Sequence, residues 1–171
     1  MKSMKTYIRF LVLSAGLVGL FAGCSEKLEP KPITYSQLLT GTEKKIWRLV
    51  SFEVVDQGEK SGVIPIQNAL DPCRSDDRYV FYADESHKLE YLNGTTKCST
   101  TEADTLFEDS WTMINSNATL EFVIPVFSGS ILPFTIKNLT ETSMTVEIYY
   151  DKIYVEPIDA SYRFTFNSTT K

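Results

Sequence analysis

Eight segments of this chain alternate apolar and polar residues with a period of two, which is the pattern of a strand that buries one face. In the last of them, Phe164 and Phe166 share one face and Thr165 lies on the other. The segments are residues 46–54, 78–82, 87–92, 110–114, 119–124, 133–138, 143–150 and 161–167. This pattern predicts an all-β domain.

Matching the apolar faces pairs neighbouring segments as antiparallel hairpins, because opposing residues share a face. The predicted opposing pairs are Phe81 with Leu89, Tyr79 with Tyr91, Trp111 with Phe122, Met113 with Leu120, Ile136 with Val146, and Phe134 with Ile148. Successive tight hairpins favour an up-and-down order, and closure of the sheet removes exposed edges. We therefore expect an eight-stranded antiparallel up-and-down barrel, with a two-sheet sandwich as the alternative.

A short N-terminal helix is expected before the first strand. Thr34 can cap the start of this helix, and Gly41 can end it. The helix leads into the first strand at the end of the barrel that carries the short turns. It can therefore close the barrel floor.

The first 23 residues have the pattern of a bacterial lipoprotein signal peptide. A basic start precedes an apolar run at residues 10–22, and Ala22-Gly23 stand directly before Cys24. The cysteine of such a signal takes a diacylglycerol before cleavage, so Cys24 is the expected lipidation site. A transmembrane helix is the alternative, but the apolar run is too short to cross roughly 30 Å of hydrocarbon comfortably.

The chain is expected to have three parts. Residues 1–23 form the signal peptide, residues 24–33 a lipidated linker, and residues 34–171 the barrel domain. By resemblance to sorting rules in other bacteria, Ser25 after the lipidated cysteine favours the bacterial outer membrane. We expect a monomer held there by its lipid anchor, on the periplasmic face or at the cell surface.

Composition and motifs argue against several function classes. The net charge of −5, without a basic block or glycine-rich phosphate loop, argues against nucleic acid as a partner. The chain lacks GxSxG and HExxH, and His87 is its one histidine. Asp76 and Asp77 suggest a turn or cap rather than a carboxylate pair or calcium ligands. We therefore expect no enzymatic activity, no cofactor and no metal.

Two cysteines remain once Cys24 is lipidated. An even pair in an oxidising compartment predicts a disulfide between Cys73 and Cys98. The hairpin register supports this pairing, because it places Cys73 opposite Lys97, one residue from Cys98. Metal binding is the weaker alternative, because neither cysteine lies in a CxxC motif.

Four long connections are expected at the end of the barrel opposite the short turns, at residues 55–77, 93–109, 125–132 and 151–160. Long loops on a rigid scaffold often carry function. Their apolar residues are Ile64, Ile66, Leu70, Val126, Phe127, Ile131, Ile153, Tyr154 and Val155. A mouth ringed by such side chains is a candidate binding site. Alternatively, the loops fold over and plug the barrel.

The barrel interior is expected to be crowded with aromatic rings. An eight-stranded barrel is just wide enough to be filled by side chains or to hold one small ligand. So many rings favour a filled interior or a shallow cavity. The candidate ligand-lining residues are Trp47, Tyr79, Phe81, Tyr91, Trp111, Phe122 and Phe127.

Several sequence blocks resemble the lipocalin-like domain found in lipoproteins of Bacteroidota. The most specific is the Cys-x-x-Asp-Asp-x-Tyr-x-Phe block at residues 73–81, with its partner Cys98. Weaker matches are residues 38–41, residues 47–51, Trp111, Leu139-Thr140 and Met144. The resemblance covers residues 34–167 and implies a barrel and an envelope location. It implies no particular ligand or activity.

A possible modification site lies at Asp104-Thr105-Leu106. This tripeptide resembles the O-glycosylation motif of Bacteroidota, and it falls in a predicted exposed loop. Thr105 is therefore the candidate acceptor.

Two functions from different classes follow from these features. The first is a non-catalytic binding module for a small apolar or amphipathic ligand at the barrel mouth. The second is a protein–protein interaction module with a filled barrel, whose loop rim contacts another envelope or host protein.

Overall fold

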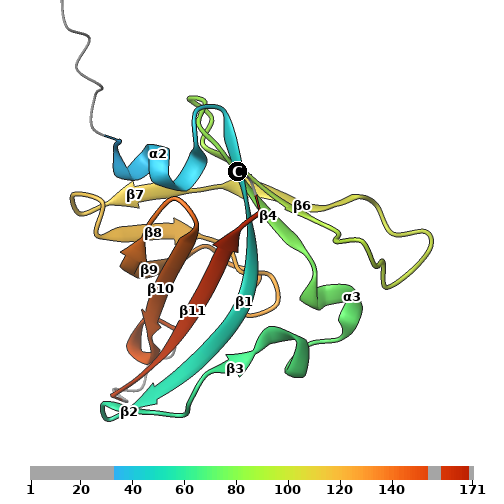
Figure 1. The fold of residues 1–171 in the computed structure, drawn as a ribbon. Coiled ribbons are helices and arrows are strands. Elements are labelled where there is room, and N and C mark those ends of the chain that lie inside the picture. The colour runs from blue at the N-terminus through green and yellow to red at the C-terminus, as the bar shows by residue number, and fades with distance from the viewer. Residues whose placement is uncertain (1–32, 154–158, 170–171) are drawn as a thin grey trace, which may run out of the picture. The chain divides into compact units, whose positions relative to one another are not determined.

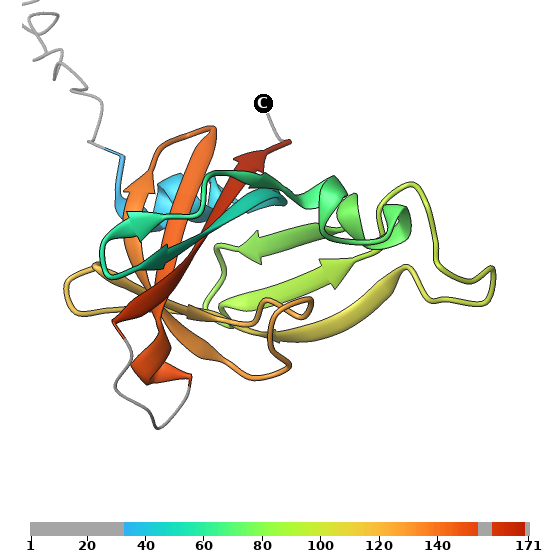
Figure 2. The same cartoon turned by 90° about the horizontal axis from the view of Figure 1, so that it is seen from below.

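The strands form one antiparallel sheet that curves until it nearly closes into a barrel (Figures 1 and 2). The computed structural model describes residues 33–153 and 159–169, which belong to one compact unit, Ile33–Lys171. Along the barrel the order is β6-β5-β4-β1-β11-β10-β9-β8-β7. The bounds are β1 Lys44–Asp56, β4 Arg78–Tyr82, β5 Lys88–Leu92, β6 Thr105–Ser110, β7 Thr112–Ile114, β8 Thr119–Phe122, β9 Leu132–Leu139, β10 Ser143–Tyr149 and β11 Ala160–Ser168. The all-β prediction is confirmed.

Nine described strands follow one another around the barrel, rather than the predicted eight, because the chain changes partner at Trp111. The segment predicted at 110–114 begins at Thr105 and is divided by Trp111 into β6, which pairs with β5, and β7, which pairs with β8. The buried Trp111 indole donates a hydrogen bond to the carbonyl oxygen of Tyr82 over 3.1 Å. This hydrogen bond anchors Trp111, the residue at which the chain passes from pairing with β5 to pairing with β8.

The predicted hairpin registers are confirmed. Phe81 lies opposite Leu89, Met113 opposite Leu120, and Val146 opposite Ile136. The predicted pairs Trp111 with Phe122 and Phe134 with Ile148 lie just beyond the last paired residues of these ladders.

Three irregularities among the described strands were not predicted. Lys137 has no opposing residue between the pairs that β9 makes with β10, and Val50 has none between the pairs that β1 makes with β11. Leu106 has none between the pairs that β6 makes with β5. A bulge of this kind changes which residues of a strand share a face.

Helix α2, Tyr35–Thr40, follows the sequence prediction closely. The Thr34 side chain and Gln37 form a capping box, and Gly41 ends the helix with a φ of 67°. Two side chains of β1 hold its last turn. Lys45 Nζ donates to the carbonyl oxygen of Leu38 over 2.9 Å, and Trp47 Nε1 donates to that of Leu39 over 2.7 Å. The helix therefore packs against the barrel through β1.

Aromatic side chains fill the interior of the barrel. The ring centroid of Phe122 lies 5.6 Å from that of Phe81, 4.9 Å from that of Phe134 and 6.1 Å from that of Phe166. Phe81 also contacts Trp111 at 6.2 Å. Rings at these separations and tilts pack as a solid core.

The long connection predicted at 55–77 is largely structured. Gln57 and Gly58 have φ values of 48° and 85°, and this turn folds the chain back onto β1. The elements that follow are β2 (Glu59–Lys60), β3 (Ile64–Pro65), the 3₁₀ helix η1 (Ile66–Asn68) and helix α3 (Pro72–Ser75). Both β2 and β3 pair with β1, so this connection is a part of the sheet rather than a free loop.

The other long connections differ in extent from the prediction. The one after β5 ends at Asp104 rather than 109, and the one after β10 begins with the 3₁₀ helix η2, Tyr150–Lys152. Tyr154 and Val155 lie outside the described residues, as do the signal peptide at 1–23 and Cys24. Within the part of the chain that is described, no helix has the length and apolar character needed to cross a membrane.

Candidate ligand-binding site

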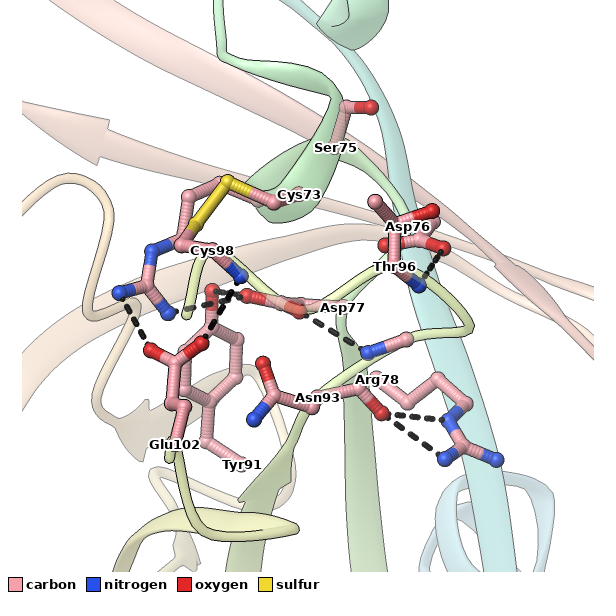
Figure 3. Close-up of polar contacts among 12 residues, drawn as sticks. Cys73, Ser75, Asp76, Asp77, Arg78, Tyr91, Asn93, Thr96, Cys98 and Glu102 are labelled. Carbon is pink, nitrogen blue, oxygen red and sulfur yellow. Dashed lines mark hydrogen bonds and ion pairs between the residues drawn. A yellow bond between two sulfur atoms is a disulfide. The ribbon is translucent and has the colours of Figure 1, made fainter. Parts of the chain in front are cut away.

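The site begins with a loop, residues 93–104, that is held in place by the segment 73–78 (Figure 3). Asp76 Oδ2 accepts hydrogen bonds from the backbone N–H of Thr95 over 2.8 Å and of Thr96 over 3.1 Å. Asp77 Oδ1 accepts from the backbone N–H of Gly94 over 3.0 Å. The two adjacent carboxylates therefore bind loop backbone, whereas the sequence suggested a turn or cap of their own.

A second set of contacts fixes the far part of the same loop. The predicted disulfide joins Cys73 to Cys98, with 5.0 Å between the Cα atoms. Arg74 pairs with Glu102 over 2.8 Å, and the other Glu102 oxygen accepts from the Cys98 N–H over 3.0 Å. Arg78 donates two hydrogen bonds to the carbonyl oxygen of Asn93. The block from Cys73 to Arg78 is thus a clamp on this loop.

The pKa values of the two clamp carboxylates, Asp76 and Asp77, are shifted in opposite directions. Burial raises the pKa of Asp77, although hydrogen bonds from Tyr91 and Gly94 and the charge of Arg74 act against it. At Asp76 burial also acts to raise the pKa, but hydrogen bonds from Thr95 and Thr96 outweigh it and leave the pKa lowered. Burial, and then the bond to Asp77, raise the pKa of Tyr91 far enough to keep its phenol protonated.

Beside the clamp, the mouth of the barrel contains an apolar cavity of about 190 Å³. It is the space between β1 and β11, the segment before α3 and the loop after β8. Its lining residues are Leu49, Phe52, Ile66, Ala69, Leu70, Val126, Phe127, Tyr162 and Phe164. The bulge at Val50 explains why both Leu49 and Phe52 reach it, since they would otherwise lie on opposite faces.

A second and wider cavity of about 660 Å³ adjoins the apolar one. Leu70 and Val126 line both cavities and form the partition between them. The other residues of the wide cavity are Arg74, Tyr91, Glu102, Leu106, Phe107 and Pro125. The mouth therefore offers an apolar compartment next to one that carries a paired cation and anion.

Two of the seven residues predicted to line a ligand site line one of these two cavities. Phe127 lines the apolar cavity, with its ring centroid 5.0 Å from that of Phe164, and Tyr91 lines the wide cavity. The other five line neither cavity and are buried in the core, because ring packing fills that part of the interior: Trp47, Tyr79, Phe81, Trp111 and Phe122.

Several lining residues were not singled out from the sequence. Arg74 comes from the clamp, Glu102 from the loop that the clamp holds, and Phe52 is brought in by the bulge. Ile66, Leu70 and Val126 were expected at the mouth as apolar loop residues, and they lie there. Thr105, the candidate glycosylation acceptor, is the first residue of β6 and is half-buried, so the prediction of an exposed loop position was wrong.

Comparison with protein-family models and with curated proteins finds no match to this chain.

Proposed function

We propose that this protein is a non-catalytic binding module of the bacterial cell envelope that takes a small amphipathic molecule at the barrel mouth. The observation that carries the proposal is the pairing of an apolar cavity with a polar one across Leu70 and Val126. The lipid anchor at Cys24 and the outer-membrane location rest on the signal-peptide pattern. The lipocalin-like assignment rests on the sequence blocks around residues 73–81.

The size of the apolar cavity limits the apolar part of the ligand. An apolar cavity of about 150 Å³ holds a benzene molecule, and this one has about 190 Å³. It therefore suits a single ring or a short alkyl chain. A long lipid tail does not fit, because the aromatic core occupies the space further inside.

The charged residues of the wide cavity limit which polar group the ligand can carry. Arg74 is bound to Glu102 over 2.8 Å and lies 3.7 Å from Asp77, so its positive charge is already balanced. A strongly anionic ligand would have to break these pairs. The site favours an uncharged group that both donates and accepts hydrogen bonds, such as a hydroxyl or an amide.

A calorimetric titration with small uncharged ring-bearing alcohols and amides, namely benzyl alcohol and benzamide, tests the site. Ala69→Phe places a ring in the apolar cavity and is expected to weaken binding by about tenfold or more. Ala83→Phe is the matched control, because Ala83 is an exposed residue near the β4–β5 turn. Equal binding by both variants and the parent protein would rule out this site.

The anchor is tested separately. In a bacterium that expresses the chain, Cys24→Ser is expected to abolish labelling by a radioactive fatty acid and to leave the signal peptide uncleaved. Labelling of the Cys24→Ser variant at the level of the parent protein would contradict the lipoprotein assignment.

A further inference from the structure

Strand β6 is an open edge of the barrel. Among the described strands it pairs only with β5, and it forms one end of the sheet, whose other end is β7 (Figures 1 and 2). The chain stops pairing with β5 after Trp111 and continues as β7, which pairs with β8. No described strand therefore covers the second edge of residues 105–110. An exposed edge of this kind presents unpaired backbone groups to a further strand.

The direction of these backbone groups follows from one hydrogen bond. The N–H of Trp111 donates to the carbonyl oxygen of His87 over 2.9 Å, so it points toward β5. Backbone groups alternate in direction along a strand, and those of Glu108 and Ser110 therefore point toward the open side. There the Ser110 N–H is met by Asp109 Oδ1 over 2.7 Å, a local bond that an incoming carbonyl oxygen can replace.

The space beside this edge is a groove rather than open surface. Leu106 and Phe107 of β6 and Pro125 and Val126 of the loop after β8 line the wide cavity from its two sides. Leu106 and Phe107 are half-buried. An extended chain laid along β6 would therefore run between two walls, with apolar surface available to alternate side chains.

The negative charges along β6 favour a basic partner. Glu102 and Asp104 are neutralised by Arg74 and Lys97, whereas Glu108 and Asp109 have no ion pair with any described residue. Glu108 lies opposite Glu90 in the β5–β6 ladder, but Glu90 is already paired with Lys88 over 2.5 Å, so Glu108 is the carboxylate of the two without an ion pair to a described residue. A second copy of this chain would bring its own Glu108 and Asp109 to the same edge, and like charges opposite each other destabilise strand pairing, so it is a poor partner for β6. Basic side chains would relieve the repulsion.

We propose that β6 is a docking edge for an extended, basic polypeptide segment of another protein, which adds to the sheet as a further strand. Main-chain hydrogen bonds to Glu108 and Ser110 supply the pairing, as in other strand-addition complexes. Lys or Arg side chains of the partner lie on the face of the sheet that carries Glu108. The apolar side chains that alternate with them lie on the face that carries Phe107.

The test uses a peptide of about eight residues, a typical strand length, in which lysine and valine alternate, and the matched peptide with glutamate in place of lysine. Binding is followed by fluorescence anisotropy and by amide hydrogen exchange. The lysine peptide is expected to slow exchange at Glu108 by about tenfold or more and to leave the amides of β10 unchanged. The glutamate peptide is expected to bind at least about tenfold more weakly.

Two variants test whether the peptide binds at the β6 edge itself. Glu108→Pro removes an N–H that faces the open side, where proline is tolerated at a sheet edge, and is expected to abolish peptide binding without unfolding the barrel. The double variant E108K/D109K is expected to reverse the preference toward the glutamate peptide. Ala69→Phe fills the apolar cavity but leaves β6 unchanged, so it is expected to bind the lysine peptide normally.

Three results would overturn the proposal. The first is lysine-peptide binding that Glu108→Pro does not reduce, and the second is an unchanged charge preference in the E108K/D109K variant. The third is the absence of lysine-peptide binding at millimolar concentration. Self-association of the protein that slows exchange at Glu108 would assign the edge to a second copy instead. None of these results depends on whether benzyl alcohol or benzamide binds at the mouth.

Discussion

The hydroxyl of Tyr91 donates a hydrogen bond to Asp77 Oδ2 over 2.6 Å, and both side chains are buried. This bond joins the inner face of β5 to the clamp that holds the loop at residues 93–104. Burial of an ionised carboxylate is costly unless its hydrogen bonds are satisfied. The barrel core and the mouth are therefore coupled through this pair.

Tyr91→Phe is expected to lower the free energy of unfolding by about 1.5–3 kcal/mol, because the hydrogen bond to a charged group is lost and the Asp77 oxygen stays buried. Urea unfolding at neutral pH measures the change. Tyr82→Phe is the control, since its hydroxyl bonds Glu90 over 2.6 Å at a half-exposed position. We expect the control to lose less than about 1 kcal/mol; a control loss as large as that of Tyr91→Phe would contradict this account.

Asp76 and Asp77 are expected to contribute to the pH dependence of stability with opposite signs. Because burial raises the folded pKa of Asp77 above 3.8, its stabilising contribution is present below pH 3.8 and is lost as the pH rises through the folded pKa. The folded pKa of Asp76 is lowered, because the bonds from Thr95 and Thr96 outweigh burial. Its contribution is therefore present above pH 3.8 and is lost as the pH falls through the folded pKa.

Urea unfolding of the parent protein, Asp76→Asn and Asp77→Asn from about pH 7 to about pH 3 tests these signs. As the pH falls, the advantage of the parent protein over Asp76→Asn should shrink. Over the same pH range, the stability of the parent protein relative to Asp77→Asn should increase. Differences that move in the same direction for both variants would refute the assignment.

Gly94→Ala is expected to destabilise the clamp, because a Cβ atom at Gly94 would overlap the Asp76 carboxylate. The loop must shift to relieve the overlap, and the hydrogen bonds to Asp76 and Asp77 are then strained. We expect a loss of about 1–3 kcal/mol in thermal or urea unfolding. Gly129→Ala is the matched control, because nothing lies within 4 Å of the added atom, and it should be nearly neutral.

Replacement of both Cys73 and Cys98 by alanine is expected to lower stability by about 3.5 kcal/mol, the chain-entropy value for a loop of this length, given a sequence separation of 25. The loop should nevertheless keep its place, because Asp76 and Asp77 bind its backbone independently. Amide exchange at Gly94 and Thr95 measures this. Complete loss of protection at these two amides would mean that the disulfide, rather than the carboxylates, positions the loop.

Much of the candidate site could be foreseen from the sequence, but its chemistry could not. Apolar residues in the long connections, such as Leu70 and Phe127, indicated a mouth, and they line it. The aromatic residues of the strands suggested a lining but form the core, because alternation identifies the inward face without showing how deeply a position is packed. Arg74 and Glu102 meet across a sequence separation that no local pattern reports.

The sequence by itself determined the features that depend on neighbours close along the chain. These are the caps of α2, the hairpin registers and the approach of Cys73 to Cys98 across one hairpin. The tertiary structure decided the bulge at Val50, the change of partner at Trp111 and the cavities on either side of Leu70. Each of these depends on packing between segments far apart in the chain: Ser51, for example, pairs with both Pro65 and Thr165. Alternation along a single strand carries no information about such partners.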